Sequence, residues 1–432
     1  MERILTALLV VACSALLRAQ TRAPEKMTRQ QAEQIALANN PRIQASQLLA
    51  KVQGQVVRER RADALPNLTG SITGVETNGA SRISAGTITA PRIVSHAGVG
   101  IGVSQLITDF GHTNNLITSE KLKEKARQAD ALASREDIVV AADQAFYAAI
   151  EARATVEVAD ETVSARQALV DKVSALAAAK LKSSLDLSFA QVDLSQAKLL
   201  QLDTRNNFDA AKAALNAVLG YDKQTDYDLV EDNGEPPALP PDPDAITATA
   251  LENRPDLQSL RFSEQAAQSF SRAQHAQLFP TISAEGMVGY APAGSSLYFT
   301  PDWYGAAGVN IGIPIFEGFR LRAQAAEASL LARTAAENTR DLKDKVVRDV
   351  RTAWLNAKNA QEKVTVSKQL LDETNTALDL AQTRYQLGLS SIVELSQAQL
   401  QQTEAAIGNA NAKAQYNFSI ANLQFQMGSN NH

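Results

Sequence analysis

The sequence is poor in the residues that carry most catalytic and metal chemistry. Its 432 residues include one cysteine, four histidines and two tryptophans, and aromatic residues make up only 5% of the chain. No two histidines have the spacing of metal ligands, so we predict no metal site, no cofactor and no catalytic residue. The histidines are His96, His112, His275 and His432.

The chain also lacks a strong charge of either sign. Its formal net charge is -5, and 21% of its residues are charged. There is no basic stripe, so nucleic acid is not an expected partner. The segment Gly98–Gly102 resembles part of a dinucleotide-binding loop, but the final glycine of that fingerprint is missing. Small residues on one face of a β-strand explain this segment better, and an enzyme is not predicted.

Residues 1–19 have the pattern of a secretory signal peptide. Arg3 provides a short positive region, residues 4–17 are nearly all apolar, and Ala19 is a small residue at a cleavage point. Cleavage there would leave a mature chain without a thiol, which excludes disulfides, cysteine–zinc sites and cysteine nucleophiles. Val10–Cys13 also resembles a lipoprotein cleavage box, although the apolar run continues past Cys13. No later window is long and apolar enough for a membrane helix.

The rest of the chain repeats itself. Pro41 recurs as Pro255 and Pro66 as Pro280, both 214 residues later, and further along the spacing is 208 residues. This pattern indicates tandem duplication of a whole structural unit. We assign repeat one to residues 20–220, repeat two to residues 244–428 and a short tail to residues 429–432. The acidic, proline-rich residues 221–243 between the repeats are expected to form an extended, solvated linker.

Each repeat begins with helices that prolines interrupt and continues with two alternating segments. The helical stretches are residues 28–64 and 244–278, and the first strands are 67–75 and 281–290. Loops rich in Gly, Ser and Thr are expected at residues 77–91 and 291–301. The second strand of each hairpin alternates apolar with small or polar residues, which predicts one lipid-facing or core-facing side. These candidate lipid-facing residues are Val99, Ile101, Val103, Val309, Ile311 and Ile313.

Aromatic residues gather around the second loop. They fit the girdle of a membrane β-barrel, although a soluble hairpin with aromatic packing would look similar. The residues are Tyr290, Tyr298, Phe299, Trp303 and Tyr304.

Two long helices complete each repeat. Residues 112–219 contain no glycine and no proline, and apolar residues recur at alternating steps of four and three. Such a 3.5-residue period predicts left-handed coiled-coil packing, here with narrow, alanine-rich seams. Arg166 alone interrupts the seam of repeat one. Reversals are expected at residues 181–184 and 388–391, followed by helix caps in which Ser183 precedes Asp186 and Ser391 precedes Glu394.

Four strands cannot cross a bilayer alone, because their outer edges would leave backbone groups unpaired in hydrocarbon. The chain is therefore expected to pool strands from several copies. The alternative is a periplasmic coiled-coil structural or adaptor protein with soluble hairpins. The alternating apolar face in all four strands favours the membrane interpretation.

The duplicated order of these features resembles the TolC family of outer-membrane efflux proteins. The resemblance rests on the Asn-Pro and Leu-Pro dipeptides at residues 40–41 and 65–66 with their counterparts at Pro255 and Pro280, on the strand ends at residues 105–111 and 314–318, and on residues 385–395. It implies a mixed α and transmembrane β fold with two structural repeats. Four strands per chain would join an oligomeric β-barrel, and long antiparallel coiled-coil helices would form a periplasmic α-barrel.

The same resemblance implies a homotrimer in the bacterial outer membrane with a long periplasmic extension. Its partners would be a periplasmic adaptor protein and an inner-membrane pump, and the channel would be a passive exit duct.

The resemblance also implies a pore entrance at the helix reversals. Glu394 would form an acidic ring, and Gln397 would make the next ring neutral. Tyr385 matches the gate tyrosine, and Asp186 matches its acidic partner from repeat one. Ser390 stands where TolC carries an arginine that helps to hold the closed state. Helix capping is the alternative role of Glu394 and Asp186.

Overall fold

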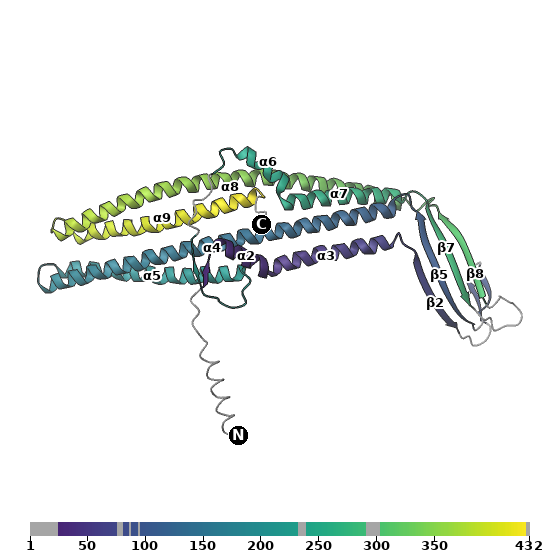
Figure 1. Ribbon diagram of the computed structural model, residues 1–432, viewed down its shortest axis with the longest axis horizontal. Helices are drawn as coiled ribbons and strands as arrows, with labels where there is room; N and C mark the ends of the chain where they lie inside the picture. Colours follow the sequence, from purple (N-terminus) through teal and green to yellow (C-terminus); the bar gives the residue numbers. More distant parts are fainter. Residues whose placement is uncertain are drawn as a thin grey trace, which may run out of the picture. The chain divides into compact units, whose positions relative to one another are not determined.

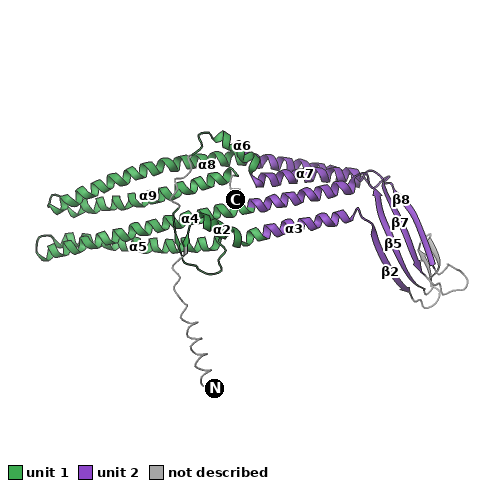
Figure 2. Ribbon diagram, in the orientation of Figure 1, with its two compact units in different colours: residues 1–44, 134–253, 346–432 green, residues 45–133, 254–345 purple. Residues whose placement is uncertain are grey.

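The computed structural model describes residues 25–75, 81–85, 88–93, 96–231, 239–290 and 303–428. The predicted signal peptide with Cys13, the aromatic residues Tyr298 and Phe299, and the C-terminal tail lie outside the described residues. The chain divides into two compact units (Figure 2). Unit 1 contains residues 1–44, 134–253 and 346–432, and unit 2 contains residues 45–133 and 254–345.

The helices confirm the duplication, because each repeat contains the same four helices in the same order (Figure 1). Their lengths are 11, 22, 67 and 35 residues in repeat one and again in repeat two. The first set is α2 (Arg29–Asn39), α3 (Pro41–Ala62), α4 (His112–Ala178) and α5 (Ser184–Val218). The second set is α6 (Pro243–Asn253), α7 (Pro255–Ala276), α8 (Arg320–Gln386) and α9 (Ile392–Gln426).

Local sequence explains where these helices begin and end. Thr28 caps α2 with a full capping box, in which its side chain accepts from the Gln31 backbone N–H and the Gln31 side chain accepts from the Thr28 backbone N–H. Pro41 and Pro255 occupy the first turn of α3 and α7, where a missing backbone N–H costs nothing. Gly220 and Gly428 follow α5 and α9 with φ of 73° and 66°, the left-handed conformation that glycine adopts without strain.

The core of unit 1 forms where α2, α4 and α5 meet a two-stranded sheet. Phe146, Leu215 and Leu219 are fully buried there. Strand β1 (Glu25–Met27) pairs in parallel with β6 (Tyr227–Leu229). Tyr227 and Leu229 are buried, so the segment expected to be a solvated linker is structured and packed over these residues. The apolar alternation of three residues is too short to distinguish such a strand from a loop.

Unit 2 contains an antiparallel sheet in the order β2, β5, β7, β8. The strands are β2 (Asn67–Val75), β5 (His96–Thr108), β7 (Thr281–Tyr290) and β8 (Trp303–Gly312). The predicted bounds of β2 and β7 are confirmed. In the register, Val103 pairs with both Leu68 and Gly286, and Ile282 pairs with Ile311. Since side chains alternate along a strand, these pairs bring the apolar residues of all four strands onto one face of the sheet.

Two strand predictions were wrong. Strand β8 ends at Gly312, so Ile313 lies outside it. Pro314 follows, and a proline cannot donate to the hydrogen-bond ladder. The expected loop at residues 77–91 contains a hairpin of β3 (Ser81–Ala85) and β4 (Ile88–Ile93). Its Gly, Ser and Thr content concealed the strand pattern. Among the helices that the structure describes, none is long and apolar enough to span a membrane.

Candidate functional site: the helix reversals of unit 1

The first reversal joins α4 to α5. Lys180 adopts a left-handed conformation with φ of 60°, and the Leu181 N–H donates to the Leu176 carbonyl across 2.8 Å. Ser183 caps α5, because its Oγ accepts a bond from the Asp186 N–H at 3.1 Å. Ser183 is therefore the capping residue, and Asp186 contributes its backbone N–H to the cap. The Asp186 carboxylate lies in the first turn, where the helix dipole stabilises it.

The second reversal joins α8 to α9 in the same manner. Gly388 has a φ of 76°, and the Leu389 N–H donates to the Arg384 carbonyl at 2.9 Å. This bond spans five residues, as in a Schellman motif. Ser391 caps α9 by accepting from the Glu394 N–H at 3.3 Å. The two reversals thus use the same cap geometry.

A small apolar cluster joins the two reversals. Val173 of α4 packs with Tyr385 of α8 and with Ile392 and Leu395 of α9. Tyr385 is only 5% exposed, although it lies one residue before the end of its helix. Burial fixes the ring between the two hairpins, which lie side by side in Figure 1. The predicted gate residue is therefore the aromatic member of a contact between the repeats.

Two charged groups of repeat one act on Tyr385. Lys182 Nζ lies 4.1 Å from the centre of the ring, within cation–π distance. Burial raises the pKa of the Tyr385 hydroxyl, and the negative charge of Asp186 raises it further. Among the described residues, the hydroxyl has no hydrogen-bond partner. The structure therefore brings Asp186 close to Tyr385 without a hydrogen bond between them.

Glu394 has a partner that the sequence analysis missed. Arg384 Nε lies 3.1 Å from Glu394 Oε1, and both side chains are about half exposed. The ion pair joins the last turn of α8 to the first turn of α9 across the reversal. A basic last turn before a tight reversal and an acidic first turn after it would have been the sequence signal. Each carboxylate of an acidic ring formed by Glu394 would therefore have a cation beside it.

The other two predicted entrance residues are not members of the apolar cluster. Gln397 is exposed on α9. Ser390 is half-buried in the reversal, and its Oγ has no hydrogen-bond partner among the described residues. Lys182, like Arg384, was not predicted from sequence.

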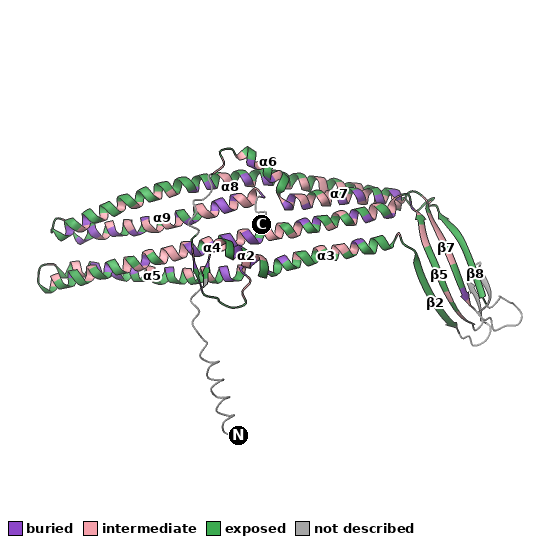
Figure 3. Ribbon diagram, viewed as in Figure 1, coloured by how far each residue is buried: buried purple, intermediate pink, exposed green. Residues whose placement is uncertain are grey.

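Most of the candidate lipid-facing side chains lie together on the sheet of unit 2. Val99, Ile101 and Val103 of β5 are 40–49% exposed, and Val309 and Ile311 of β8 are 63% and 57% exposed. The same face contains Leu68 and Ile72 of β2, which are 71% and 89% exposed. Figure 3 shows that β8 is exposed along its length. A contiguous apolar face on a four-stranded sheet requires a partner or lipid.

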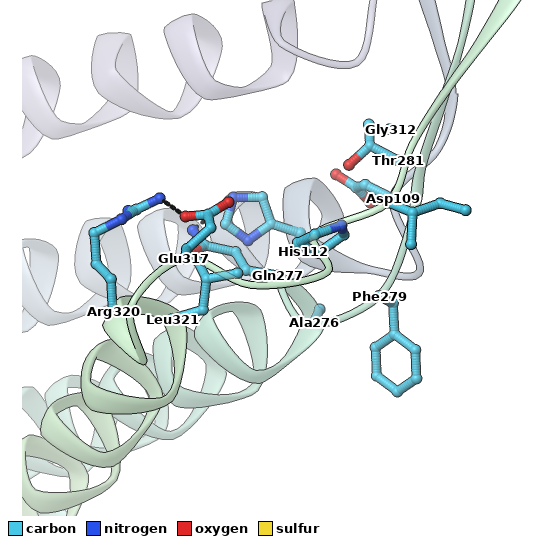
Figure 4. A pocket seen from close by; sticks show the side chains of 12 residues that line it. Asp109, His112, Ala276, Gln277, Phe279, Thr281, Gly312, Glu317, Arg320 and Leu321 are labelled. Atoms are coloured by element: carbon cyan, nitrogen blue, oxygen red, sulfur yellow. Dashed lines mark hydrogen bonds and ion pairs between the residues drawn. The ribbon is translucent and has the colours of Figure 1, made fainter.

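A cavity of about 550 Å³ opens where the strands of unit 2 meet its helices (Figure 4). Glu317 forms an ion pair with Arg320 beside it, and Asp109 caps α4 by accepting from the Thr113 N–H at 2.7 Å. His112 Nδ1 lies 2.9 Å from the Ala273 carbonyl oxygen. Each of these polar side chains therefore already has a bonding partner. No group of three or more His, Cys, Asp and Glu residues within the described ranges could hold a metal ion.

Comparison with known proteins assigns a family to this architecture. The family model for outer membrane efflux proteins matches residues 32–221 and 247–429, which are the two repeats. Outer membrane protein OprJ of Pseudomonas aeruginosa is 26% identical over 373 residues, covering 84% of this chain and 76% of OprJ. Outer membrane protein TolC of Salmonella enteritidis is 20% identical over 420 residues, covering 93% and 82%.

Solved structures show the same fold. The outer membrane protein VceC of Vibrio cholerae superimposes with a TM-score of 0.79 at 18% identity, covering 93% of this chain and 96% of VceC. The CmeC outer membrane channel of Campylobacter jejuni gives a TM-score of 0.81 at 18% identity, covering 93% and 85%. With both repeats matched by the family model and the fold shared with these channels, the chain belongs to the outer membrane efflux protein family, the TolC-like channels.

Proposed function

We propose that this outer-membrane efflux channel works as a homotrimer. It would receive substrates from an inner-membrane pump through a periplasmic adaptor protein and act as a passive exit duct without chemistry of its own. The observation that carries the proposal is the four-stranded sheet of unit 2, which combines one apolar face with two open edges.

The sheet cannot be stable in lipid as a single copy. Among the described strands, β2 and β8 each pair on one side only. Unpaired backbone groups cost several kcal/mol each in hydrocarbon, so membrane sheets close into barrels. Four strands are too few to enclose a lumen, and copies of the chain must join β2 of one to β8 of the next. Family membership supports three copies.

We also propose that the helix reversals form the gate. Tyr385 packs between the α4–α5 and α8–α9 hairpins and lies close to Lys182 and Asp186 of the first hairpin. The ion pair of Glu394 with Arg384 spans the α8–α9 reversal. Gln397 and Ser390 would line the entrance next to them. The buried ring of Tyr385 supports a closed state in which both hairpins pack together.

Cross-linking of the strand edges tests the assembly. The variant Thr69→Cys with Gly308→Cys places one thiol on β2 and one on β8, which occupy opposite edges of the sheet. A short bifunctional thiol reagent should convert it into covalent dimers and trimers in isolated outer membranes. Each single variant should give no covalent trimer. A detergent-free, monodisperse single-copy species with folded hairpins would refute the proposed assembly.

A further inference from the structure

The residue that interrupts the coiled-coil seam of repeat one lies beside a cavity. Arg166 on α4 is 7% exposed, and its Nη1 has no hydrogen-bond partner among the described residues. The cavity has a volume of about 210 Å³, and residues of α4, α8 and α9 line it. Arg166 is the cationic member of this lining, and the others used below are Thr162, Gln399, Gln402 and Thr403. A buried guanidinium without a close partner is costly, so the structure requires an explanation for it.

Three other polar side chains of the lining are already bonded. Thr162 Oγ donates to the Val158 carbonyl at 2.7 Å, and Thr403 Oγ donates to the Gln399 carbonyl at 3.0 Å. Gln402 Nε2 donates to Asn375 Oδ1 at 3.1 Å. Two buried atoms of the lining have no hydrogen-bond partner within the described part of the chain, and these are Arg166 Nη1 and Gln399 Oε1. An amide rotated by 180° would present Nε2 in place of Oε1, so both groups can donate into the cavity.

The nearest counter-charge does not neutralise Arg166 directly. Asp193 on α5 raises the pKa of Arg166 through its charge, while burial lowers it by a larger amount. No ion pair joins the two residues in the described structure, and Asp193 Oδ2 is itself buried without a partner. Glu161, the acidic residue of the lining, is exposed. Water could fill the cavity, which has room for several molecules at about 30 Å³ each, and would hydrate the guanidinium, but water supplies no counter-charge.

We propose that this cavity binds a small monovalent anion, such as a halide or nitrate, between the two helical hairpins. The Arg166 guanidinium would supply the charge, and the Gln399 amide would supply a second donor. The anion would connect α4 to α9 and thereby stabilise the packing of the hairpins. This site is separate from the helix reversals and does not depend on the proposed gate.

Comparison of the repeats supports a specific role for this cavity. With the repeat spacing of 208 residues, the position equivalent to Arg166 is Thr374, and the position equivalent to Asp193 is Gln401. Thr374 Oγ donates to the Leu370 carbonyl of its own helix at 2.9 Å. The fold therefore accepts a small neutral residue at this position of the seam. The cation in repeat one is not required for the coiled coil to form, and Arg166→Thr is a substitution that should fold.

Two measurements on the purified full-length channel in detergent test the proposal. The first is the melting temperature in sodium bromide or nitrate against sodium gluconate at constant ionic strength. The second is anomalous diffraction from crystals grown in bromide. Bromide should raise the melting temperature in the millimolar range, and an anomalous peak should lie within hydrogen-bond distance of Arg166 Nη1.

Variants distinguish an anion site from a structural charge pair. Arg166→Thr should abolish both the thermal response and the peak, whereas Lys172→Gln, which removes an exposed cation from the same helix, should preserve them. Asp193→Asn should shift the thermal response to several-fold lower bromide, because a competing negative charge is gone. The proposal is overturned if the wild type shows no peak at Arg166, if the response persists in Arg166→Thr, or if Asp193→Asn destabilises the channel without changing the response.

Discussion

A buried acidic group in unit 1 should make the stability of this channel depend on pH. Asp143 on α4 is 2% exposed and lies beside Glu33 and Arg29 of α2. Arg29 Nη1 is 2.7 Å from Glu33 Oε1 but 3.4 Å from Asp143 Oδ2, so the guanidinium is closer to Glu33. Burial, and then the negative charge of Glu33, raises the pKa of Asp143 from 3.8 to about 8. Asp143 is therefore protonated in the folded channel at neutral pH.

The sign of the effect follows from linkage. A carboxyl group whose pKa is higher in the folded state binds more protons there than in the unfolded chain. The protonated Asp143 carboxyl therefore contributes fully to stability below about pH 4, and this contribution is lost as the pH rises toward 8. Each pH unit in this window lowers the free energy of unfolding by about 1.36 kcal/mol per chain. Between pH 5 and pH 7 the loss is about 2.7 kcal/mol on the same basis.

Asp143→Asn removes this loss while preserving the size and polarity of the side chain. We expect the variant to melt at a similar temperature to the wild type at pH 4 and several degrees higher at pH 7.5, with a smaller decrease between them. Circular dichroism of the detergent-solubilised channel measures the transition. Asp203→Asn, which removes an exposed carboxylate from α5, is the matched control and should leave the pH dependence unchanged. Equal pH dependence in wild type and Asp143→Asn would show that Asp143 is ionised in the folded protein and would refute the reasoning.

Three further predictions concern the channel itself. Glu394→Gln should weaken the block of the channel by multivalent cations added from the periplasmic side, as measured in bilayer conductance recordings. Arg384→Gln should strengthen this block, because it frees the Glu394 carboxylate from its ion pair. Unchanged block in both variants would exclude an acidic ring. Ile311→Lys should lower the yield of trimers in the outer membrane, because a cation on the lipid face costs about 2–4 kcal/mol at the membrane midplane; normal yield would contradict the facing of β8. Phe319→Gly should raise the melting temperature in detergent by relieving about 1 kcal/mol of strain at a φ of 64°. A decrease would show that the edge contact of its ring with Phe316, at 5.5 Å between ring centres, outweighs the strain.

The sequence predicted the elements whose signals are local and repeated. The bounds of β2 and β7 follow from a proline directly before each strand and from period-two alternation. The breaks at Pro41 and Pro255 follow from proline chemistry alone. Ile313 was assigned to a strand because the alternation continues through it, whereas the hydrogen-bond ladder cannot continue through Pro314.

The features that the sequence did not reveal depend on contacts between distant segments. Strands β1 and β6 pair across about two hundred residues of chain, and each is only three residues long. At the reversals, resemblance to a family identified Tyr385 and Glu394. Whether Lys182 and Arg384 contact them depends on the direction in which each side chain points at the end of its helix. Adding one residue to a helix rotates the next side chain by about 100°. Sequence patterns do not locate a helix end to within one residue, so they do not fix this rotation.

The energies at the reversals are suited to a gate that a partner protein opens. Arg384 and Glu394 are half exposed, so their ion pair contributes about 0–1 kcal/mol. The cation–π contact of Lys182 with Tyr385 contributes about 0.5–1 kcal/mol at such a position. The Tyr385 hydroxyl adds no hydrogen bond among the described residues. Polar interactions there total about 0.5–2 kcal/mol per chain, and only the cation–π contact joins the two hairpins, because both residues of the ion pair belong to the α8–α9 reversal. This total does not exceed the 1–3 kcal/mol that a bound partner typically couples to a distant state. A gate held by several buried ion pairs would resist that coupling, whereas separation of the hairpins at these reversals would be opposed mainly by the apolar cluster of Val173, Tyr385, Ile392 and Leu395.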